Sequence, residues 1–117
     1  MVKLDFTKSA LGDLLELASF YESQGVPAVG QRFVKEIIAK VERLKSHPDS
    51  GRIVPEFGVP FLREIIHPPF RVVYRRDPHR VSIVRVWRSE RLMHMTLGSV
   101  KGSGPVFTML RQGKNDN

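Results

Sequence analysis

Three segments rich in β-branched and aromatic residues, joined by very short connections, constrain the fold of this chain more than any other feature. They read "FLREII", "FRVVYRR" and "VSIVRVWR", and the joins between them are "HPP" and "DPH". Such joins are too short for a helical crossover between parallel strands, and they are rich in turn-forming residues. The sequence therefore predicts three consecutive strands in an antiparallel meander.

The N-terminal half predicts a short strand followed by two helices. Apolar and polar residues alternate over residues 2–6, as in a half-buried strand. Apolar side chains then recur every three or four residues over residues 7–23, where Thr7 can serve as the N-cap of an amphipathic helix. A second apolar stripe covers residues 29–44, with Pro27 at a favoured first-turn position. A few residues separate the two helices, so we expect them to form an antiparallel hairpin.

These elements predict an α+β fold with the order β-α-α-β-β-β. The helical hairpin would pack its apolar faces on a small, mostly antiparallel sheet. Alternation alone does not decide which face of the sheet meets the helices. Strict alternation does place four side chains of the last strand on one face: Val81, Ile83, Arg85 and Trp87.

The chain is sized for a single domain with a moderate core, at 117 residues and 41% hydrophobic residues. We assign the domain to residues 1–97 and predict that the glycine-containing segment 98–117 is a flexible tail. There is no cysteine, which is compatible with a reducing compartment, and no stretch approaches the ~18 apolar residues of a membrane span. We therefore expect a soluble, cytoplasmic protein.

Positive charge is concentrated in the predicted meander. Residues 52–91 carry nine basic residues, all arginine, against four acidic ones, whereas residues 1–51 carry seven of each sign. Arginine offers a planar fork for phosphate, carboxylate or aromatic partners, which lysine does not. The segment is therefore either a set of solvated strand faces or a surface that recognises an anionic partner.

Few catalytic patterns are present. No glycine-rich phosphate loop follows a strand, and no two histidines have metal-ligand spacing, so we expect neither a cofactor nor a metal. A carboxylate and arginine set remains, in which Glu56 could act as a base towards an RNA 2′-hydroxyl and Arg71 could clamp the phosphate. Arg88 would complete this set, although an arginine stays protonated and is a poor proton donor.

Each of these side chains also has a structural interpretation. Glu64 would pair with a neighbouring arginine across the sheet. Arg71 is either a phosphate clamp or simply held by a carboxylate near a helix. Trp87, next to Arg85 on the same strand face, is either a base-stacking platform or, more commonly for a single tryptophan in a small domain, part of the core.

The order of elements and motifs resembles the RelE/ParE superfamily of toxins from type II toxin–antitoxin modules. The resemblance covers residues 2–94 and is carried by "AVGQRFVKEIIAKVERLKSHPDSGR" followed by "GRIVPEF", "LREI", "FRVVYRR" and "VSIVRVWRSER". It implies a helical hairpin on a mostly antiparallel sheet, as the periodicities predict. It also implies a growth-arresting toxin that a cognate antitoxin neutralises, with no small-molecule cofactor and no membrane partner.

The resemblance leaves two activities open. RelE-like members cleave messenger RNA on the ribosome, and ParE-like members poison DNA gyrase without being nucleases. Glu56 and Arg71 match the nuclease set, but Arg88 stands where nucleases of this superfamily often carry histidine. The forms "GRIVPE" and "LREI" are more ParE-like, which favours gyrase. An inactive relative that only binds its antitoxin is the third interpretation.

On the leading interpretation, six side chains of the basic segment contact the target or the antitoxin: Arg52, Arg63, Arg75, Arg85, Trp87 and Arg91.

Overall fold

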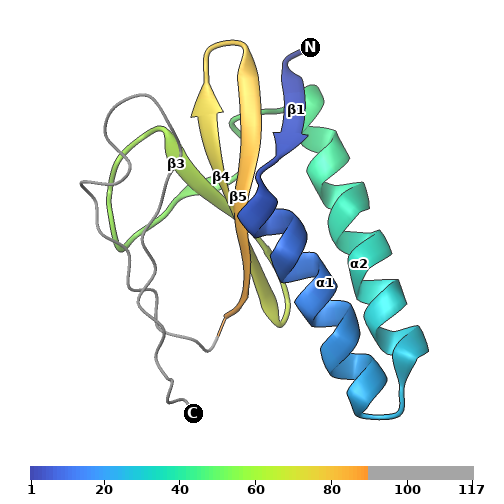
Figure 1. The fold of residues 1–117 in the computed structure, drawn as a ribbon. Helices are drawn as coiled ribbons and strands as arrows, with labels where there is room; N and C mark the ends of the chain where they lie inside the picture. The colour runs from blue at the N-terminus through green and yellow to red at the C-terminus, as the bar shows by residue number, and fades with distance from the viewer. Residues whose placement is uncertain (90–117) are drawn as a thin grey trace.

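The computed structural model describes residues 1–89 and has two helices on one face of a five-stranded sheet (Figure 1). Arg91, the end of the predicted domain and the predicted tail 98–117 lie outside the described residues. The elements, in chain order, are β1 (Lys3–Phe6), α1 (Lys8–Ser23), α2 (Pro27–Glu42), the 3-10 turn η1 (Arg43–Lys45), β2 (Arg52–Ile53), β3 (Leu62–His67), β4 (Phe70–Asp77) and β5 (Arg80–Arg88).

The strand order is β1-β5-β4-β3-β2. The three meander strands are antiparallel as expected, and β1 runs parallel to β5 at one edge. The two-residue strand β2, which the sequence did not predict, pairs with β3 at the other edge. The predicted α+β class and the order of the main elements are confirmed.

Local signals in the sequence set the ends of the helices. The Thr7 hydroxyl accepts a hydrogen bond from the Ala10 N–H and thereby caps α1, as expected. Gly25, at a φ of 79°, takes the left-handed conformation that reverses the chain after α1. Pro27 begins α2, where its missing N–H costs nothing. Neither helix within residues 1–89 has the length and apolarity needed to cross a bilayer.

The main core lies between the helices and one face of the sheet. Ile37 and Val41 of α2 are fully buried, and they belong to one apolar cluster with Phe70, Val72 and Tyr74 of β4. The helix-facing side of β4 is therefore the side that carries Phe70. Burying side chains of this kind supplies the hydrophobic stabilisation of the fold, at about 1.5–3 kcal/mol each.

A second apolar cluster lies on the opposite face of the sheet, which we call the outer face. Its buried members are Val54, Leu62, Val73, Val84 and Trp87. Three partly buried side chains from the segment between β2 and β3 pack against it: Phe57, Val59 and Phe61. Both faces of the sheet are thus apolar at the centre, which explains why the strands read as nearly continuous hydrophobic runs.

A β-bulge in β5 changes the face on which the end of that strand presents its side chains. The register shifts so that Val73 pairs with Arg85 while Tyr74 pairs with Ile83. Val81 and Ile83 belong to the helix-side cluster, whereas Trp87 belongs to the outer one. Strict alternation, which placed these residues on one face, was therefore wrong, because a bulge inserts one extra residue into the strand.

Asp13 of α1 supports the bulge. Its carboxylate accepts two bonds from the Arg85 guanidinium and one from the Val86 N–H, each 2.8 Å long. The Asp13 side chain is only 7% exposed. One buried carboxylate therefore connects the first helix to the irregular part of the last strand.

We expect Asp13→Ala to lower the free energy of unfolding by about 3 kcal/mol, because the substitution leaves a largely buried arginine without its charge partner. Urea denaturation followed by Trp87 fluorescence measures the loss. The matched control is Asp5→Ala, which removes the exposed ion pair with Arg80 and should cost less than about 1 kcal/mol. Equal losses in the two variants would contradict the role assigned to Asp13.

Candidate functional site

Two of the three candidate catalytic residues, Glu56 and Arg71, lie near a buried carboxylate on the outer face of the sheet. The Glu64 side chain is fully buried. Arg52 Nε donates to Glu64 Oε2 at 2.7 Å, and Arg71 Nε donates to Glu64 Oε1 at 2.7 Å. Charge-assisted bonds to both carboxylate oxygens offset the cost of removing this charge from water. The expected pairing of Glu64 with an arginine is thus present, with two arginines instead of one.

Glu56, the candidate base, is held by the candidate phosphate clamp. Arg71 Nη1 and Nη2 donate to the two carboxylate oxygens of Glu56, each at 2.9 Å. These bonds lower the pKa of Glu56 and raise that of Arg71. A carboxylate with a lowered pKa is a weaker proton acceptor, and Arg71 is shared between two carboxylates. The arrangement stabilises a charge network and is poorly suited to general-base catalysis.

Arg88 does not join Glu56 and Arg71. It pairs across the sheet with Phe70, whose side chain faces the helices. Arg88 Nη1 donates to the Tyr21 hydroxyl of α1 at 3.1 Å, and its guanidinium lies 5.6 Å from the centre of the Phe70 ring. The structure brings two of the three candidate catalytic side chains together, and places the third on the helix side of the sheet.

The candidate contact residues differ widely in exposure. Among those within residues 1–89, Arg52 is the most open, with 60% of its side chain exposed. Arg75 pairs with Asp77, and Arg85 lies over the Trp87 ring while bound to Asp13. Trp87 itself is only 4% exposed and belongs to the outer cluster, and its Nε1 has no hydrogen-bond partner.

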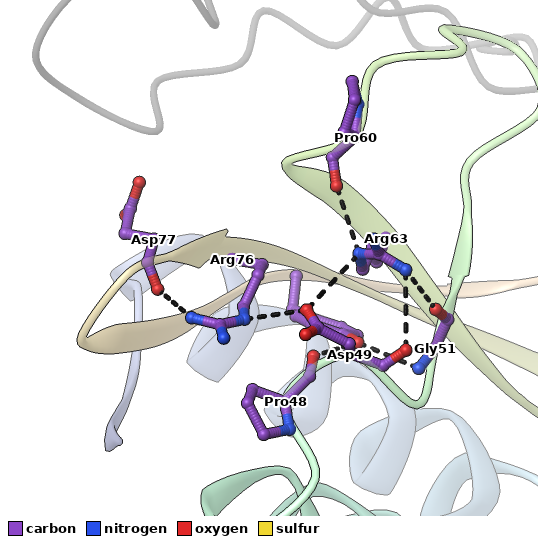
Figure 2. A network of polar contacts seen from close by, with 8 residues as sticks. Pro48, Asp49, Gly51, Pro60, Arg63, Arg76 and Asp77 are labelled. Atoms are coloured by element: carbon purple, nitrogen blue, oxygen red, sulfur yellow. Dashed lines mark hydrogen bonds and ion pairs between the residues drawn. The ribbon is translucent and has the colours of Figure 1, made fainter. Parts of the chain in front are cut away.

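A polar network that the sequence did not predict fixes the loop before β2 (Figure 2). The Tyr74 hydroxyl donates to the Pro48 carbonyl at 2.8 Å and accepts from the Gly51 N–H at 3.0 Å. Its burial raises the pKa of Tyr74, which keeps the phenol protonated as this donor. The loop is thus attached to β4 through its backbone.

Two arginines complete this network. Arg63 donates to the carbonyls of Pro60 and Gly51, and Arg76 Nε donates to the Asp49 carboxylate at 2.8 Å (Figure 2). The bond from Arg76 lowers the pKa of Asp49. The one available signal was "HPDSG", in which an aspartate and a glycine mark a turn; the distant arginines that bind it could not be identified from spacing.

We expect Gly51→Ala to be strongly destabilising, because a methyl group there would lie 2.6 Å from the Tyr74 hydroxyl and 2.7 Å from the Glu64 carbonyl oxygen. Tyr74→Phe, which leaves the Gly51 N–H without its acceptor, should cost about 1–3 kcal/mol. Gly12→Ala in α1 is the control: its methyl would meet nothing within 4 Å and should stabilise the helix by up to about 1 kcal/mol. Thermal denaturation ranks the three variants, and a Gly51→Ala protein as stable as wild type would refute the close packing.

The Glu56–Arg71 pair predicts a specific acid sensitivity. Because the pKa of Glu56 in the folded protein lies below its ordinary value of 4.5, the pair contributes stability above that pH, and this contribution is lost as the pH falls through the lowered pKa. Glu56→Gln should therefore lower stability at neutral pH and make the decline between about pH 5 and pH 3 shallower. Urea midpoints across this range test it, with Glu22→Gln, an exposed residue of α1, as the control expected to follow wild type.

The described residues contain no cluster of three or more histidine, aspartate or glutamate side chains that could hold a metal ion. The carboxylates of Glu56 and Glu64 are neutralised by the guanidinium groups of Arg52 and Arg71.

Comparisons with known proteins agree with this architecture. Residues 4–93 match the model of the family described as the ParE toxin of the type II toxin–antitoxin system parDE. A solved structure of the chromosomal ParDE system from P. aeruginosa is 26% identical, with a TM-score of 0.66 over 77% of this chain and 98% of that one.

The toxin–antitoxin complex RelBE2 from Mycobacterium tuberculosis has the same fold, with a TM-score of 0.54 at 21% identity over 77% of this chain and 97% of that one. A comparison with curated proteins found no match. The family model covers most of the chain, and its range ends just beyond β5. This chain belongs to the ParE toxin family of type II toxin–antitoxin systems.

Proposed function

We propose that this protein is the toxin of a type II toxin–antitoxin pair, and that it arrests growth in the cytoplasm by poisoning DNA gyrase. The observation that carries the proposal is the match to the ParE toxin family over residues 4–93. ParE-like members of the superfamily, which the motifs "GRIVPE" and "LREI" resemble, act on gyrase without cleaving RNA. A cognate antitoxin is the second partner, by analogy with the ParDE system from P. aeruginosa.

The chemistry of the outer face supports a binding protein over a nuclease. The Glu56 carboxylate is occupied by Arg71 and has a lowered pKa, so it is a weak base at neutral pH. Arg71 is only 9% exposed and is bound to two carboxylates. A phosphate would have to displace these partners before the arginine could stabilise it.

A gyrase assay tests the proposal directly. Purified toxin, added to gyrase, ATP and supercoiled plasmid, should accumulate linear DNA that carries covalently attached gyrase. Addition of the purified antitoxin should abolish the effect. Glu56→Gln should retain the activity, since the proposal gives Glu56 no chemical role.

The same toxin is then induced in cells and the ends of cellular transcripts are mapped. Intact messages with damaged DNA agree with gyrase poisoning. Cleavage of translated messages that Glu56→Gln abolishes, with inert gyrase, would replace the proposal with the ribosome-dependent nuclease. If cells that express the protein grow normally, the proposal is wrong, and the protein is a non-toxic relative that only binds its antitoxin.

A further inference from the structure

A small basic groove lies between the C-terminal end of α2 and strand β3, and we call it the α2–β3 groove. Its volume is about 370 Å³. The residues that line it come from α2, η1, the loop before β2, β2 and β3: Lys40, Arg43, Ser50, Gly51, Arg52, Glu64, Ile65 and Ile66. Three of these side chains are basic, and only Glu64 is acidic.

The positive charge of the groove is not neutralised by nearby carboxylates. The Glu64 side chain is fully buried, and both of its oxygens already accept bonds from arginines. The two carboxylates of α2, Glu36 and Glu42, pair with other side chains. Within residues 1–89, neither Lys40 nor Arg43 therefore has an anionic partner.

Two of the three cations are held in place by bonds to the protein. Arg52 Nε and Nη2 each lie 2.7 Å from Glu64 Oε2, while 60% of the Arg52 side chain stays exposed. Its Nη1 has no acceptor within residues 1–89 and is left to donate to a ligand. Lys40 Nζ donates to the Ile66 carbonyl at 3.1 Å, a neutral acceptor that leaves the ammonium charge unpaired. Donors that are already oriented cost less entropy when a ligand binds.

The backbone at the end of α2 does not present a free carbonyl at Arg43. The N–H groups of Ser46 and His47 donate to the Arg43 carbonyl at 3.2 Å and 3.0 Å. These bonds reduce the negative charge that an unsatisfied helix end would place beside an anion. Ser50, an exposed residue of the lining, adds a hydroxyl donor.

We propose that the α2–β3 groove binds the polyphosphate group of a small molecule, as in a nucleoside triphosphate. Lys40, Arg43 and Arg52 would contact the phosphate oxygens, which fit the planar fork of arginine.

The spacing of the cations favours this ligand. Lys40 and Arg43 are about one helical turn apart, and adjacent phosphates share a bridging oxygen, so several negative charges can reach both cations. Carboxylates on one side of an extended peptide lie about 7 Å apart, so a peptide would bring fewer charges into so small a volume.

This inference goes beyond the function proposed above, and neither depends on the other. A failed gyrase assay would leave the polyphosphate site standing, and a groove that binds no polyphosphate would leave the gyrase proposal standing. Free nucleoside triphosphates and the 5′-triphosphate ends of transcripts both carry the group that the groove would recognise.

The test titrates the full-length toxin with inorganic triphosphate, at constant ionic strength, while NMR spectra of the amides and of the arginine side chains are recorded. Triphosphate should shift the Nε–H signals of Arg43 and Arg52 and the amides of residues 50–52. ATP should shift the same signals, and AMP should bind at least about tenfold more weakly because it brings one phosphate.

Two further ligands identify the source and the class of partner. A short RNA with a 5′-triphosphate that binds more tightly than ATP would show that the groove takes transcript ends, and equal or weaker binding would show that it takes the free nucleotide. The proposal is wrong if triphosphate shifts no signal, if the shifts lie on another surface, or if AMP binds as tightly as ATP. Tighter binding at the groove by a blocked peptide of alternating glutamate and valine would also refute it.

Charge removal separates this groove from general attraction to a basic protein. The double variant Lys40→Gln/Arg43→Gln should weaken triphosphate binding by about 100-fold. Lys3→Gln/Lys8→Gln is the matched control, since it changes the net charge equally; Lys3 is on β1, at the opposite edge of the sheet. Equal weakening in both double variants would contradict a local site.

Single variants of Arg43 keep the test decisive if the double variant does not fold. The Arg43 side chain is exposed and bonds to no group within residues 1–89, so its replacement should leave the fold intact. Arg43→Gln should weaken triphosphate binding about tenfold, and Arg43→Lys, which keeps the charge but loses the fork, should weaken it less. Unchanged affinity in Arg43→Gln would refute the proposal.

Discussion

The buried carboxylate of Glu64 is the constraint on which the outer half of the molecule depends. Because its side chain is fully buried, it requires cationic partners at both oxygens. Arg52 of β2 is the partner of one oxygen, and this bond helps to anchor a strand of only two residues. Arg71 supplies the other from β4 and extends the network to Glu56 in the segment between β2 and β3. Strand, loop and sheet are joined through one acidic side chain.

Arginines bound to acceptors within the domain recur along β2 to β5. The high arginine content of these strands therefore serves the fold itself. The eight arginines between residues 52 and 88 each bind a carboxylate, a carbonyl or a hydroxyl within the domain. Residues 52–88 thus form neither a plain solvated face nor an open anion-binding surface. Arg52 and Arg80 nevertheless remain accessible, with 60% and 49% of their side chains exposed.

Prediction from the sequence succeeded where the signal was local or periodic. Thr7 and Pro27 begin their helices as expected, and the short joins produced the antiparallel meander. The candidate catalytic set required Glu56 and Arg71 to lie together, and the structure joins them as an ion pair. β2 was missed because two residues carry no periodicity. The face of Trp87 was misassigned because a bulge, held by Asp13 from a distant helix, breaks the alternation.

The sequence by itself determined the order of elements, the apolar faces of the helices and the family resemblance, because these depend on spacing along the chain. Tertiary structure alone decided which carboxylate each arginine meets. Arg85 binds Asp13 and Arg76 binds Asp49 across long separations, and no rule of spacing connects such residues. Burial then determined the role of Arg71. A guanidinium removed from water is stabilised by a neighbouring carboxylate, so Arg71 forms a salt bridge with Glu56.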